Sequence, residues 1–507
     1  MSSPKHGFGT VGIVGAGLMG RGIAQITAQA GFDVLLFDSK AGAADDARAS
    51  IADTLATLAA KGKIDASSAD RATAHISLPG TIDALGAVDL VIEAIVERLD
   101  AKQALFRSLE AIVSERCILA TNTSSLSVTG IAAACAKPAR VAGLHFFSPV
   151  PLMKVVEVID GVLTAPDVLS RLVDFARALG HTPVRAKDTP GFIVNHAGRG
   201  YGTEALRIVA EGIAGFESVD RILKQAAGFR MGPFELLDLT GLDVSHPVME
   251  SIYHQFYGEP RFRPSPLTAQ RLAAGLLGRK SGRGFYDYRA KQPSAVADAA
   301  PNASPARCVW ISASEAEPRA RVAELVESLG ADVIEGSTPP GDAICLVLPL
   351  GRDATTAALD EGLDPTRTLA LDTMFEVRAQ RTLMKTPVTD AAVTDSARAL
   401  FAADGASVDI IHDSPGFVAQ RVIAHIVNIA CDIAQQRIAS PADIDLAVRI
   451  GLGYPAGPLA WGDALGATRV LRILEEMLRA YGDPRYRASP WLSRRARLGV
   501  SLLTPES

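Results

Sequence analysis

The stretch "TVGIVGAGLMG", residues 10–20, decides the fold class of this 507-residue chain. A short apolar run ends there at a glycine, and a helical pattern follows to about Ala30. "FDVLLFD" (32–38) then has the composition of a second buried strand. Strand, glycine turn, helix and strand in this order are typical of the start of a parallel α/β sheet. The sequence therefore predicts an N-terminal domain of this class.

Within that stretch, "GAGLMG" (15–20) has the pattern G-x-G-x-x-G, after a predicted strand and at the start of a helix. Gly15 permits the tight turn, Gly17 lets the backbone approach a pyrophosphate, and Gly20 permits close packing of helix on strand. Free N–H groups at the helix N-terminus then point at the phosphates. Asp38, at the end of the second strand, can bind a ribose diol and repels a 2′-phosphate, which favours NAD over NADP. A glycine turn without a ligand is the alternative.

The rest of the chain alternates between strand-like and helical segments. Strand-like runs continue at "VDLVIEA" (88–94), "CILATN" (117–122), "RVAGLHFF" (140–147), "KVVEVI" (154–159) and "HTPVRA" (181–186). They return, after a helical region, at "RCVWIS" (307–312), "ADVIEG" (331–336), "AICLVLPL" (343–350) and "LALDT" (369–373). These changes predict a Rossmann-type NAD-binding domain (1–187), a helical domain (188–290), an Ala/Pro/Ser-rich linker (291–305), a second α/β domain (306–412) and a second helical domain (413–507).

The helical domain is predicted to occur twice, because three of its motifs recur in the same order and at a nearly constant spacing. The pairs are "DTPGF" (188–192) and "DSPGF" (413–417), "MGPFELLD" (231–238) and "AGPLAWGD" (456–463), "YGEPRFRPSP" (257–266) and "YGDPRYRASP" (481–490). The alternative is convergent turn chemistry around glycine and proline. In the second α/β region "ASEAEPRARV" follows the first strand without a single glycine. We therefore interpret it as a degenerate or unrelated α/β domain that binds no dinucleotide.

The bulk composition restricts the class of protein. The formal net charge of −5 argues against a nucleic-acid binder, which needs a basic face. Five scattered cysteines without a CxxC pair predict reduced thiols in a cytosolic protein, with no disulfide frame and no metal site. The N-terminus has no apolar signal region, and no apolar run approaches the ~20 residues that span a bilayer. The chain is expected to be a cytoplasmic protein of two to four domains.

Four polar residues are candidates for chemistry. His145 is expected at the carboxyl end of a strand, where ligands bind in open α/β sheets. Glu157 lies in the apolar run "KVVEVI", and a buried carboxylate needs a partner, for which His145 is the obvious candidate. Such a pair suits a general base. Ser124 follows another predicted strand, and Asn195 begins the helical domain. The alternatives are a core histidine, a turn or N-cap serine and a surface asparagine.

Six motifs together resemble a known family. "VGIVGAGLMGRGIAQ", "VIEAIVE", "NTSSLSVT", "GLHFFSPVPLMKVVEVI", "DTPGFIVN" and "GPFELLDLTGLD" occur in the order found in L-3-hydroxyacyl-CoA dehydrogenases, including bacterial 3-hydroxybutyryl-CoA dehydrogenases. The resemblance covers about residues 8–288. The second helical copy resembles the C-terminal domain of the same family, and a long form with two such copies is similar to the dehydrogenases of bacterial phenylacetate catabolism.

The resemblance implies roles for individual residues. His145 matches the catalytic base and Glu157 its partner, while Ser124 and Asn195 match the residues around the C3 oxygen of the substrate. Lys63 matches, less closely, a lysine near the CoA phosphates. Ser148 replaces the Asn of the common motif "HFFNPVP" near the nicotinamide, where we expect tuning of activity. The cofactor-binding residues expected for NAD are Gly15, Gly17, Leu18, Met19, Gly20, Asp38, Glu97, Lys102, Asn122 and Ser148.

The implied activity is oxidation of an L-3-hydroxyacyl-CoA to the 3-oxoacyl-CoA, in fatty-acid or phenylacetate-type catabolism. The tail can end in a methyl, as in 3-hydroxybutyryl-CoA, or in a carboxylate, as in 3-hydroxyadipyl-CoA, for which Arg199, Arg207 and Arg230 are candidate partners. Gln420 stands where the first copy has Asn195, so the second copy is expected to be catalytically silent. We expect the two helical copies to form a pseudo-dimer within the chain. Two alternatives are an NAD dehydrogenase of free hydroxy acids and a non-catalytic NAD-binding protein.

Overall fold

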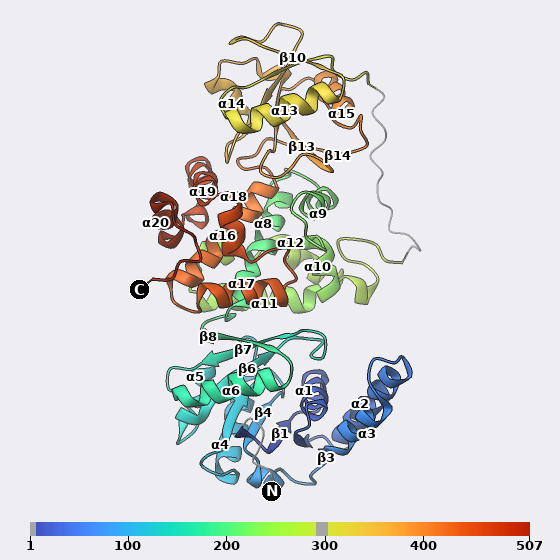
Figure 1. The fold of residues 1–507 in the computed structure, drawn as a ribbon, viewed down its shortest axis with the longest axis vertical. Helices are drawn as coiled ribbons and strands as arrows, with labels where there is room; N and C mark the ends of the chain where they lie inside the picture. The colour runs from blue at the N-terminus through green and yellow to red at the C-terminus, as the bar shows by residue number, and fades with distance from the viewer. Residues whose placement is uncertain (1–6, 290–302, 507) are drawn as a thin grey trace. The chain divides into compact units, whose positions relative to one another are not determined.

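The chain forms two compact units. The computed structural model describes residues 7–289 and 303–506, so most of the linker expected at 291–305 lies outside the described residues. The first unit joins Met1–His196 with Gln436–Leu452, and the second joins Ala197–Gln435 with Gly453–Ser507. Figure 1 traces the chain by colour through its helices and strands. The domain boundaries expected from the sequence stay a prediction.

The described part of the first unit contains one eight-stranded sheet in the order β3-β2-β1-β4-β5-β6-β7-β8. Neighbouring strands are parallel except for the antiparallel pair β6–β7. Its strands are β1 (Thr10–Val14), β2 (Asp33–Phe37), β3 (Ile76–Ser77), β4 (Leu90–Glu93), β5 (Ile118–Thr121), β6 (Val141–Phe146), β7 (Val155–Asp160) and β8 (Thr182–Lys187). The predicted Rossmann-type sheet is confirmed; strand β3 is too short to be recognised from its pattern.

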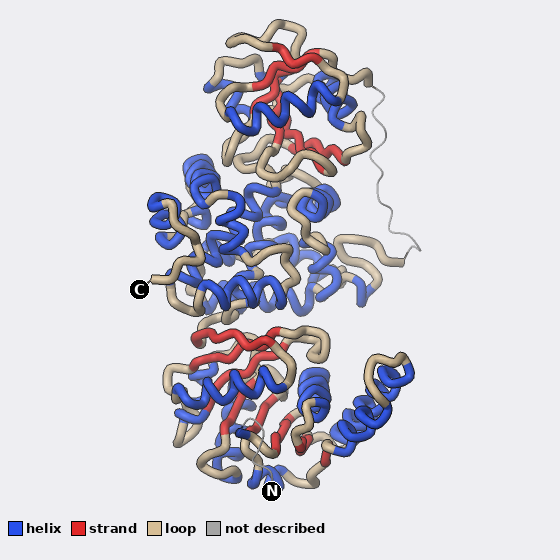
Figure 2. Tube along the Cα trace, in the orientation of Figure 1, coloured by secondary structure: helices blue, strands red, loops and turns tan. Residues whose placement is uncertain are grey.

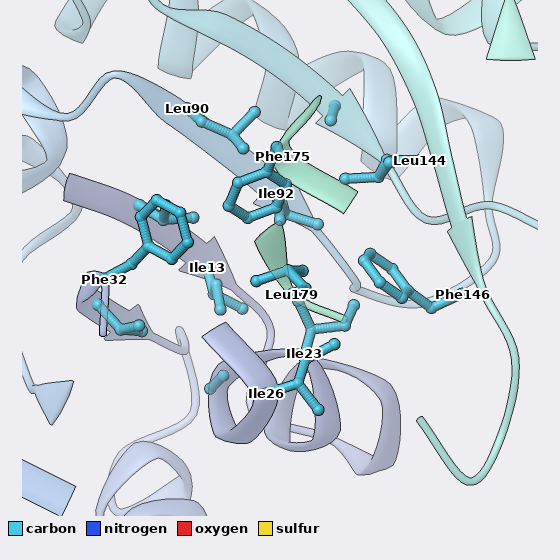
Figure 3. Close-up of a cluster of buried hydrophobic side chains, with 14 of the residues drawn as sticks. Ile13, Ile23, Ile26, Phe32, Leu90, Ile92, Leu144, Phe146, Phe175 and Leu179 are labelled. Carbon is cyan, nitrogen blue, oxygen red and sulfur yellow. The ribbon is translucent and has the colours of Figure 1, made fainter. Parts of the chain in front are cut away.

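Helices cover both faces of this sheet. Side chains of α1 (Leu18–Gln29), α2 (Ala43–Ala60), α3 (Ala66–Ala74) and α6 (Pro166–Ala178) share one core with the strands, and those of α4 (Leu99–Ile112) and α5 (Val128–Ala132) share the other. Figure 3 shows Ile23 and Ile26 of α1 and Phe175 of α6 packed on Ile13 and Ile92. Burying each such side chain contributes about 1.5–3 kcal/mol. This double layer of helices holds the carboxyl ends of the strands in place.

The second unit contains most of both helical copies and the second α/β domain. In Figure 2 its helices are coloured blue and its strands red. Its helices are α8 (Arg199–Ala210), α9 (Phe216–Gln225), α10 (Pro233–Thr240), α11 (Leu242–Gln255), α12 (Pro266–Ala273), α13 (Ala316–Ser328), α14 (Ala354–Asp360), α15 (Ala391–Phe401), α16 (Ala419–Gln435), α18 (Pro458–Leu465), α19 (Ala467–Tyr481) and α20 (Pro490–Leu498). Its sheet has the order β10-β9-β11-β12-β13-β14. These strands are β9 (Cys308–Ile311), β10 (Asp332–Ile334), β11 (Ile344–Val347), β12 (Thr368–Leu371), β13 (Gln380–Lys385) and β14 (Ser407–Ile411).

The second α/β domain repeats the far edge of the first. Strands β13 and β14 follow β7 and β8 at the same spacing along the chain as the two Asp-x-Pro-Gly-Phe motifs. The pairing also recurs, because β12–β13 is antiparallel and β13–β14 parallel, as β6–β7 and β7–β8 are. The duplication therefore begins before the "DTPGF" motif, and we interpret the domain as degenerate, not unrelated. The sequence pattern does not indicate β13 or β14, because buried polar residues such as Gln380 and Arg381 interrupt the apolar runs.

The recurring Asp-x-Pro-Gly-Phe motif joins each α/β domain to the segment that follows. The Asp188 carboxylate accepts backbone N–H groups of Val128 and Thr129 at 3.0 and 2.7 Å, and so caps α5. The Asp413 carboxylate caps α14 in the same way, at 2.8 Å from the N–H of Ala354. Both motifs also turn through positive φ, 48° at Phe192 and 49° at Phe417. The repeat thus preserves a capped turn with a special backbone conformation.

The described residues include no helix with the length and apolar character needed to cross a bilayer. All five cysteines are free, and four of them are buried. Among the residues that the structure describes, no three His, Cys, Asp or Glu side chains are grouped so that they could hold a metal ion.

A buried ion pair joins the two helical copies inside the second unit. Helix α8 packs along α16, and the guanidinium of Arg421 lies 2.8 Å from the carboxylate of Glu204, both without solvent exposure. Burial raises the pKa of Glu204, but Arg421 and Arg485 more than offset this, so its pKa is lowered to about 2. A second cross-copy pair joins Arg261 and Asp432 at 2.8 Å. The first copy is therefore tied to the second by one fully buried ion pair and one largely buried ion pair.

Removing the charge of Glu204 should destabilise the protein strongly. Glu204→Gln leaves Arg421 short of a buried partner, which costs about 3–5 kcal/mol of unfolding free energy in urea titrations at pH 7. Because the pKa of Glu204 is lowered in the folded state, its contribution is present above its unfolded pKa and is lost as pH falls toward 2. Glu317→Gln, in an exposed pair with Arg321, is the control and should cost less than about 0.5 kcal/mol. Equal losses in both variants would contradict the role of burial.

Candidate active site

An imidazole and a carboxylate face each other across the antiparallel strands β6 and β7. His145 pairs with Glu157 in the strand register, so both side chains project from the same face of the sheet. His145 Nδ1 lies 2.7 Å from Glu157 Oε2. His145 is 4% exposed and Glu157 is fully buried. Because the carboxylate accepts a hydrogen bond at Nδ1, we assign the proton to Nδ1, which leaves a lone pair on Nε2.

The other oxygen of Glu157 is held by the segment that enters the helical domain. Glu157 Oε1 accepts the backbone N–H groups of Ile193 and Val194, each at 2.9 Å. These donors stand at the start of α7 (Val194–Ala197), which also carries Asn195. The rings of Phe147 and Phe192 lie 4.3 and 5.8 Å from the His145 ring, centroid to centroid. The orientation of the imidazole is thus fixed by hydrogen bonds on one side and rings on the other.

Asn122 and Ser124 follow strand β5, next to the end of β6. The Asn122 side-chain oxygen accepts the backbone N–H of Phe146 at 2.8 Å and ties the two strand ends together. The backbone N–H of Ser124 donates to Glu97 at 3.0 Å, and its side chain is partly exposed. Ser148 lies just beyond β6 and is exposed. The carboxyl ends of β5 and β6 therefore gather three of the expected site residues.

Glu97 and Lys102 belong to a charge network around the buried Lys102 ammonium. Lys102 Nζ lies 2.5 Å from Glu93 and 3.2 Å from Glu97, and it is only 1% exposed. Burial raises the pKa of Glu97, but hydrogen bonds from Thr123 and the charge of Lys102 outweigh this, so its pKa is lowered overall. Lys102 therefore presents almost no surface to a ligand, and Glu97 is the member of the pair that reaches the strand ends.

The glycine loop fits a dinucleotide. Gly15 has φ +106°, and a Cβ on Gly20 would lie 1.7 Å from the Gly15 carbonyl oxygen, so a side chain at either position would disrupt the turn. A Cβ on Gly17 would meet no atom within 4 Å, which leaves the open face that a pyrophosphate needs. The Asp38 carboxylate accepts the N–H of Ala16 at 2.7 Å and keeps lone pairs for ribose hydroxyls.

The remaining expected residues divide into two groups. Leu18 and Met19 open helix α1, and Leu18 is 64% exposed beside the glycine loop. Lys63 instead lies in the exposed turn between α2 and α3, where its described side chain contacts none of the other expected site residues. A cavity of about 780 Å³ lined largely by alanines runs between these two helices. The structure brings the catalytic and NAD candidates together and leaves Lys63 apart from them.

The second half has different groups at the matching positions. Asp372 stands opposite Thr382 across β12 and β13, as His145 stands opposite Glu157. Gln420, the counterpart of Asn195, donates to Asp372 at 2.9 Å and accepts the N–H of Gly351 at 2.8 Å. Burial raises the pKa of Asp372. These side chains satisfy one another, and the position holds no imidazole.

Sequence reasoning missed two features of the site. Glu93 ends the apolar run "VDLVIEA", and the signal that drew attention to Glu157, an acid in an apolar run, could have found it. The N–H groups of Ile193 and Val194 left no such signal, because any residue except proline supplies a backbone donor.

Comparison with known proteins identifies the family. The model of the 3-hydroxyacyl-CoA dehydrogenase NAD binding domain matches residues 10–189. The model of the 3-hydroxyacyl-CoA dehydrogenase C-terminal domain matches 191–288 and again 416–501. Two long relatives come from Escherichia coli K12. A 3-hydroxyadipyl-CoA dehydrogenase is 39% identical over 489 residues, which are 96% of this chain and 98% of the relative. A crystal structure of 3-hydroxybutyryl-CoA dehydrogenase has a TM-score of 0.85 at 38% identity, over 97% of this chain and 98% of its own.

A shorter relative matches the first half alone. A probable 3-hydroxybutyryl-CoA dehydrogenase of Deinococcus radiodurans is 42% identical over 277 residues, which are 55% of this chain and 99% of the relative. The duplicated C-terminal domain and NAD as cofactor, both expected from the sequence, are confirmed by these matches. The chain therefore belongs to the 3-hydroxyacyl-CoA dehydrogenase family and is an NAD-dependent dehydrogenase.

Proposed function

We propose that the protein oxidises L-3-hydroxyacyl-CoA thioesters to 3-oxoacyl-CoA with NAD, and that His145 is the general base. The observation that carries the proposal is the 2.7 Å contact between His145 and Glu157 in a chain of this family. The contact leaves Nε2 as the nitrogen that can accept a proton. The same site works in reverse when His145 starts protonated, so it also supports reduction of the 3-oxoacyl-CoA.

In the proposed reaction, His145 Nε2 accepts the proton of the 3-hydroxyl group while the C3–H bond breaks. NAD, when bound, supplies the acceptor for the hydride that leaves C3. Glu157 stabilises the positive imidazolium across 2.7 Å, and its own position is held by two backbone N–H groups. Ser124 and Asn195 are assigned to orient the C3 oxygen, chiefly an effect of geometry.

For the cofactor, we propose that Gly15, Gly17 and Gly20 form the pyrophosphate turn and that Asp38 binds the adenosine ribose. Glu97 is assigned to the nicotinamide side, with Lys102 holding it in place through the 3.2 Å ion pair. Leu18, Met19, Asn122 and Ser148 are assigned as further NAD contacts. Lys63 keeps its proposed place near the CoA phosphates, because an exposed lysine on a helical hairpin can reach a long ligand.

For the acyl tail, we propose a carboxylate end, as in the substrate that names the E. coli relative. Of the three arginines considered, Arg207 is already paired with Glu211 and Asp483, both at 2.6 Å, and Arg230 is exposed. Arg199 is partly buried and lies close to Tyr454 of the second helical copy.

Two further observations favour Arg199 for this role. The hydroxyl of Tyr454 is buried without a hydrogen-bond partner in the described structure, and it could donate to a carboxylate. Arg199 also follows shortly after Asn195 along the chain. A dicarboxylic substrate would agree with the phenylacetate-type catabolism expected from the sequence, which stays a prediction.

The second helical copy is proposed to act as an internal dimer partner. The packing of α8 on α16 and the buried Glu204–Arg421 pair support this, since they cover surface that a single copy would expose. A cytoplasmic location, with no nucleic-acid partner, is proposed from the five free cysteines and the negative net charge. Association of whole chains into a homo-oligomer is compatible with this arrangement.

The first experiment follows the oxidation of NADH by acetoacetyl-CoA and by 3-oxoadipyl-CoA. The wild type should turn over at least one thioester with NADH and should discriminate against NADPH because of Asp38. His145→Gln should lower kcat by about 10²–10⁴-fold, the usual contribution of general acid–base catalysis. An unchanged kcat in this variant would show that His145 is not the general base. Turnover of free hydroxy acids but of no CoA ester would favour the alternative dehydrogenase.

Arg199→Gln should separate the two substrate classes. Loss of a charged contact to the tail carboxylate is worth about 1.5–3 kcal/mol, so KM for 3-oxoadipyl-CoA should rise about 10–100-fold. Acetoacetyl-CoA, which lacks the carboxylate, should keep its KM. Arg230→Gln, at an exposed position, is the matched control and should change neither constant. An equal rise in KM for both thioesters would show that Arg199 does not bind the tail carboxylate.

A chain that ends after Tyr288 should test the internal partner. It lacks α16 and Arg421, so the covered face of α8 becomes exposed together with the unpaired Glu204. We expect self-association in size-exclusion chromatography with light scattering. A soluble, fully active monomer would overturn the covering role.

A further inference from the structure

A helix from the second helical copy packs on the catalytic sheet. Residues 436–452 belong to the first compact unit, and they include α17 (Pro441–Gly451). Helix α17 contacts β7 and β8, and the carbonyl of Ile438 accepts the N–H of Lys187 at 2.8 Å. The half of the chain that lacks the His–Glu pair therefore supplies part of the packing around Glu157.

The first helical copy makes the matching contact with the second α/β domain. Ile213 and His412 are the counterparts of Ile438 and Lys187 in the repeat, and the carbonyl of Ile213 accepts the N–H of His412 at 2.9 Å. Helix α9 of the first copy correspondingly contacts β13 of the second α/β domain. Each helical copy therefore packs one helix against the α/β domain of the other half. The two contacts are the same piece of architecture, and only one of them lies beside a His–Glu pair.

The last residue of α17 stands against the backbone that holds Glu157. A Cβ on Gly451 would lie 3.0 Å from a methyl carbon of Val194 and 3.2 Å from a side-chain carbon of Val155. The N–H of Val194 is one of the two backbone donors to Glu157 Oε1. Val155 begins β7, the strand that carries Glu157. Gly451 therefore packs against the side chain of a residue whose N–H binds Glu157 and against the strand that carries Glu157.

The close approach of neighbouring side chains, and not the backbone conformation, accounts for a glycine at position 451. Gly451 is absent from the residues with positive φ, so an alanine could adopt its backbone angles. Alanine is also favoured over glycine in a helix by about 1 kcal/mol. A side chain here, however, would meet two valines closer than ordinary contact distance. At the reciprocal contact the counterparts are Ala226 for Gly451 and Ala419 for Val194, so the repeat has a larger residue on the helix and a smaller one on the facing segment.

We infer that Gly451 is a positioning residue for the dehydrogenase reaction: its missing side chain lets α17 press Val194 and Val155 into the arrangement that aims Glu157 at His145. The inference rests on the proposed role of His145 as base. It gives the second helical copy a part in catalysis although that copy brings no reacting group. This contribution comes from packing next to the hydrogen bonds that hold the Glu157 carboxylate.

Gly451→Val tests the inference in the oxidation direction, with NAD and 3-hydroxybutyryl-CoA. The added methyl groups should displace the 193–194 backbone, so kcat should fall about tenfold or more, since misplacing a catalytic group by 1 Å can cost about 10²-fold. KM for NAD should stay within about twofold of the wild type, because the glycine loop and Asp38 are not moved. The acid limb of the kcat profile should move to lower pH, because a displaced carboxylate stabilises the imidazolium less. An unchanged kcat and pH profile would overturn the inference.

Rescue and controls separate positioning from general damage. Val194→Ala makes room, so Gly451→Val combined with Val194→Ala should recover most of kcat, whereas strictly additive losses would contradict the contact. Ala226→Val is the matched control, because it perturbs the reciprocal contact beside Thr382 and should leave kcat and the pH profile unchanged. A loss there as large as in Gly451→Val would show a general structural effect and overturn the inference.

A smaller substitution keeps the test decisive if Gly451→Val does not give folded protein by circular dichroism. Gly451→Ala then replaces it, with an expected loss of about two- to fivefold in kcat and the same direction of pH shift. No change in Gly451→Ala would overturn the inference. Failure of the proposed function is distinguished by His145→Gln: if that variant keeps its kcat, the base assignment falls, whereas a silent Gly451 with an essential His145 removes the positioning role alone.

Discussion

A carboxylate buried on β7, the second strand from one edge of the sheet, sets a requirement that its neighbours in the first unit meet. Glu157 has no solvent contact, so its oxygens need partners from the protein. Antiparallel pairing with β6 brings one partner, His145, and the turn after β8 brings two backbone N–H groups. That turn needs the positive φ of Phe192 and the cap that Asp188 places on α5. The "DTPGF" motif therefore forms the turn that supplies two of the partners of the buried Glu157 carboxylate.

The second half has the same arrangement of strands and turn but no glutamate at the position that matches Glu157. Thr382 stands in place of Glu157, and Asp372 with Gln420 closes the position by mutual hydrogen bonds. The capped turn at Asp413 and its positive φ at Phe417 persist, because they also connect the domain to α16. The capped turn is thus present in both halves, whereas the His–Glu pair occurs at these strand positions in the first half alone.

The sequence revealed most of the fold where side-chain pattern and position coincide. Apolar runs marked β1, β2 and β4 to β12, and the glycine loop marked the end of β1. It could not reveal β13, since Arg381 is buried there through contacts with Asp404 and the Phe401 carbonyl that no local pattern encodes. Nor could it reveal the place of α17, because an amphipathic helix shows which face is buried but not which domain covers it. His145 and Glu157 were predictable as a pair; their backbone support was not.

Joining both halves in one chain removes a constraint that identical subunits impose. In a symmetric dimer every contact occurs twice with the same residues, so a change that improves one site must be accepted at the other. Here the reciprocal contacts of α9 and α17 carry Ala226 in one half and Gly451 in the other. Covalent linkage also keeps the two halves at a high effective concentration, so the second half can diverge at the positions of the glycine loop and of His145 and still pack on the first. Its divergence is then compatible with the continued contact of α17 with the strands and turn around Glu157.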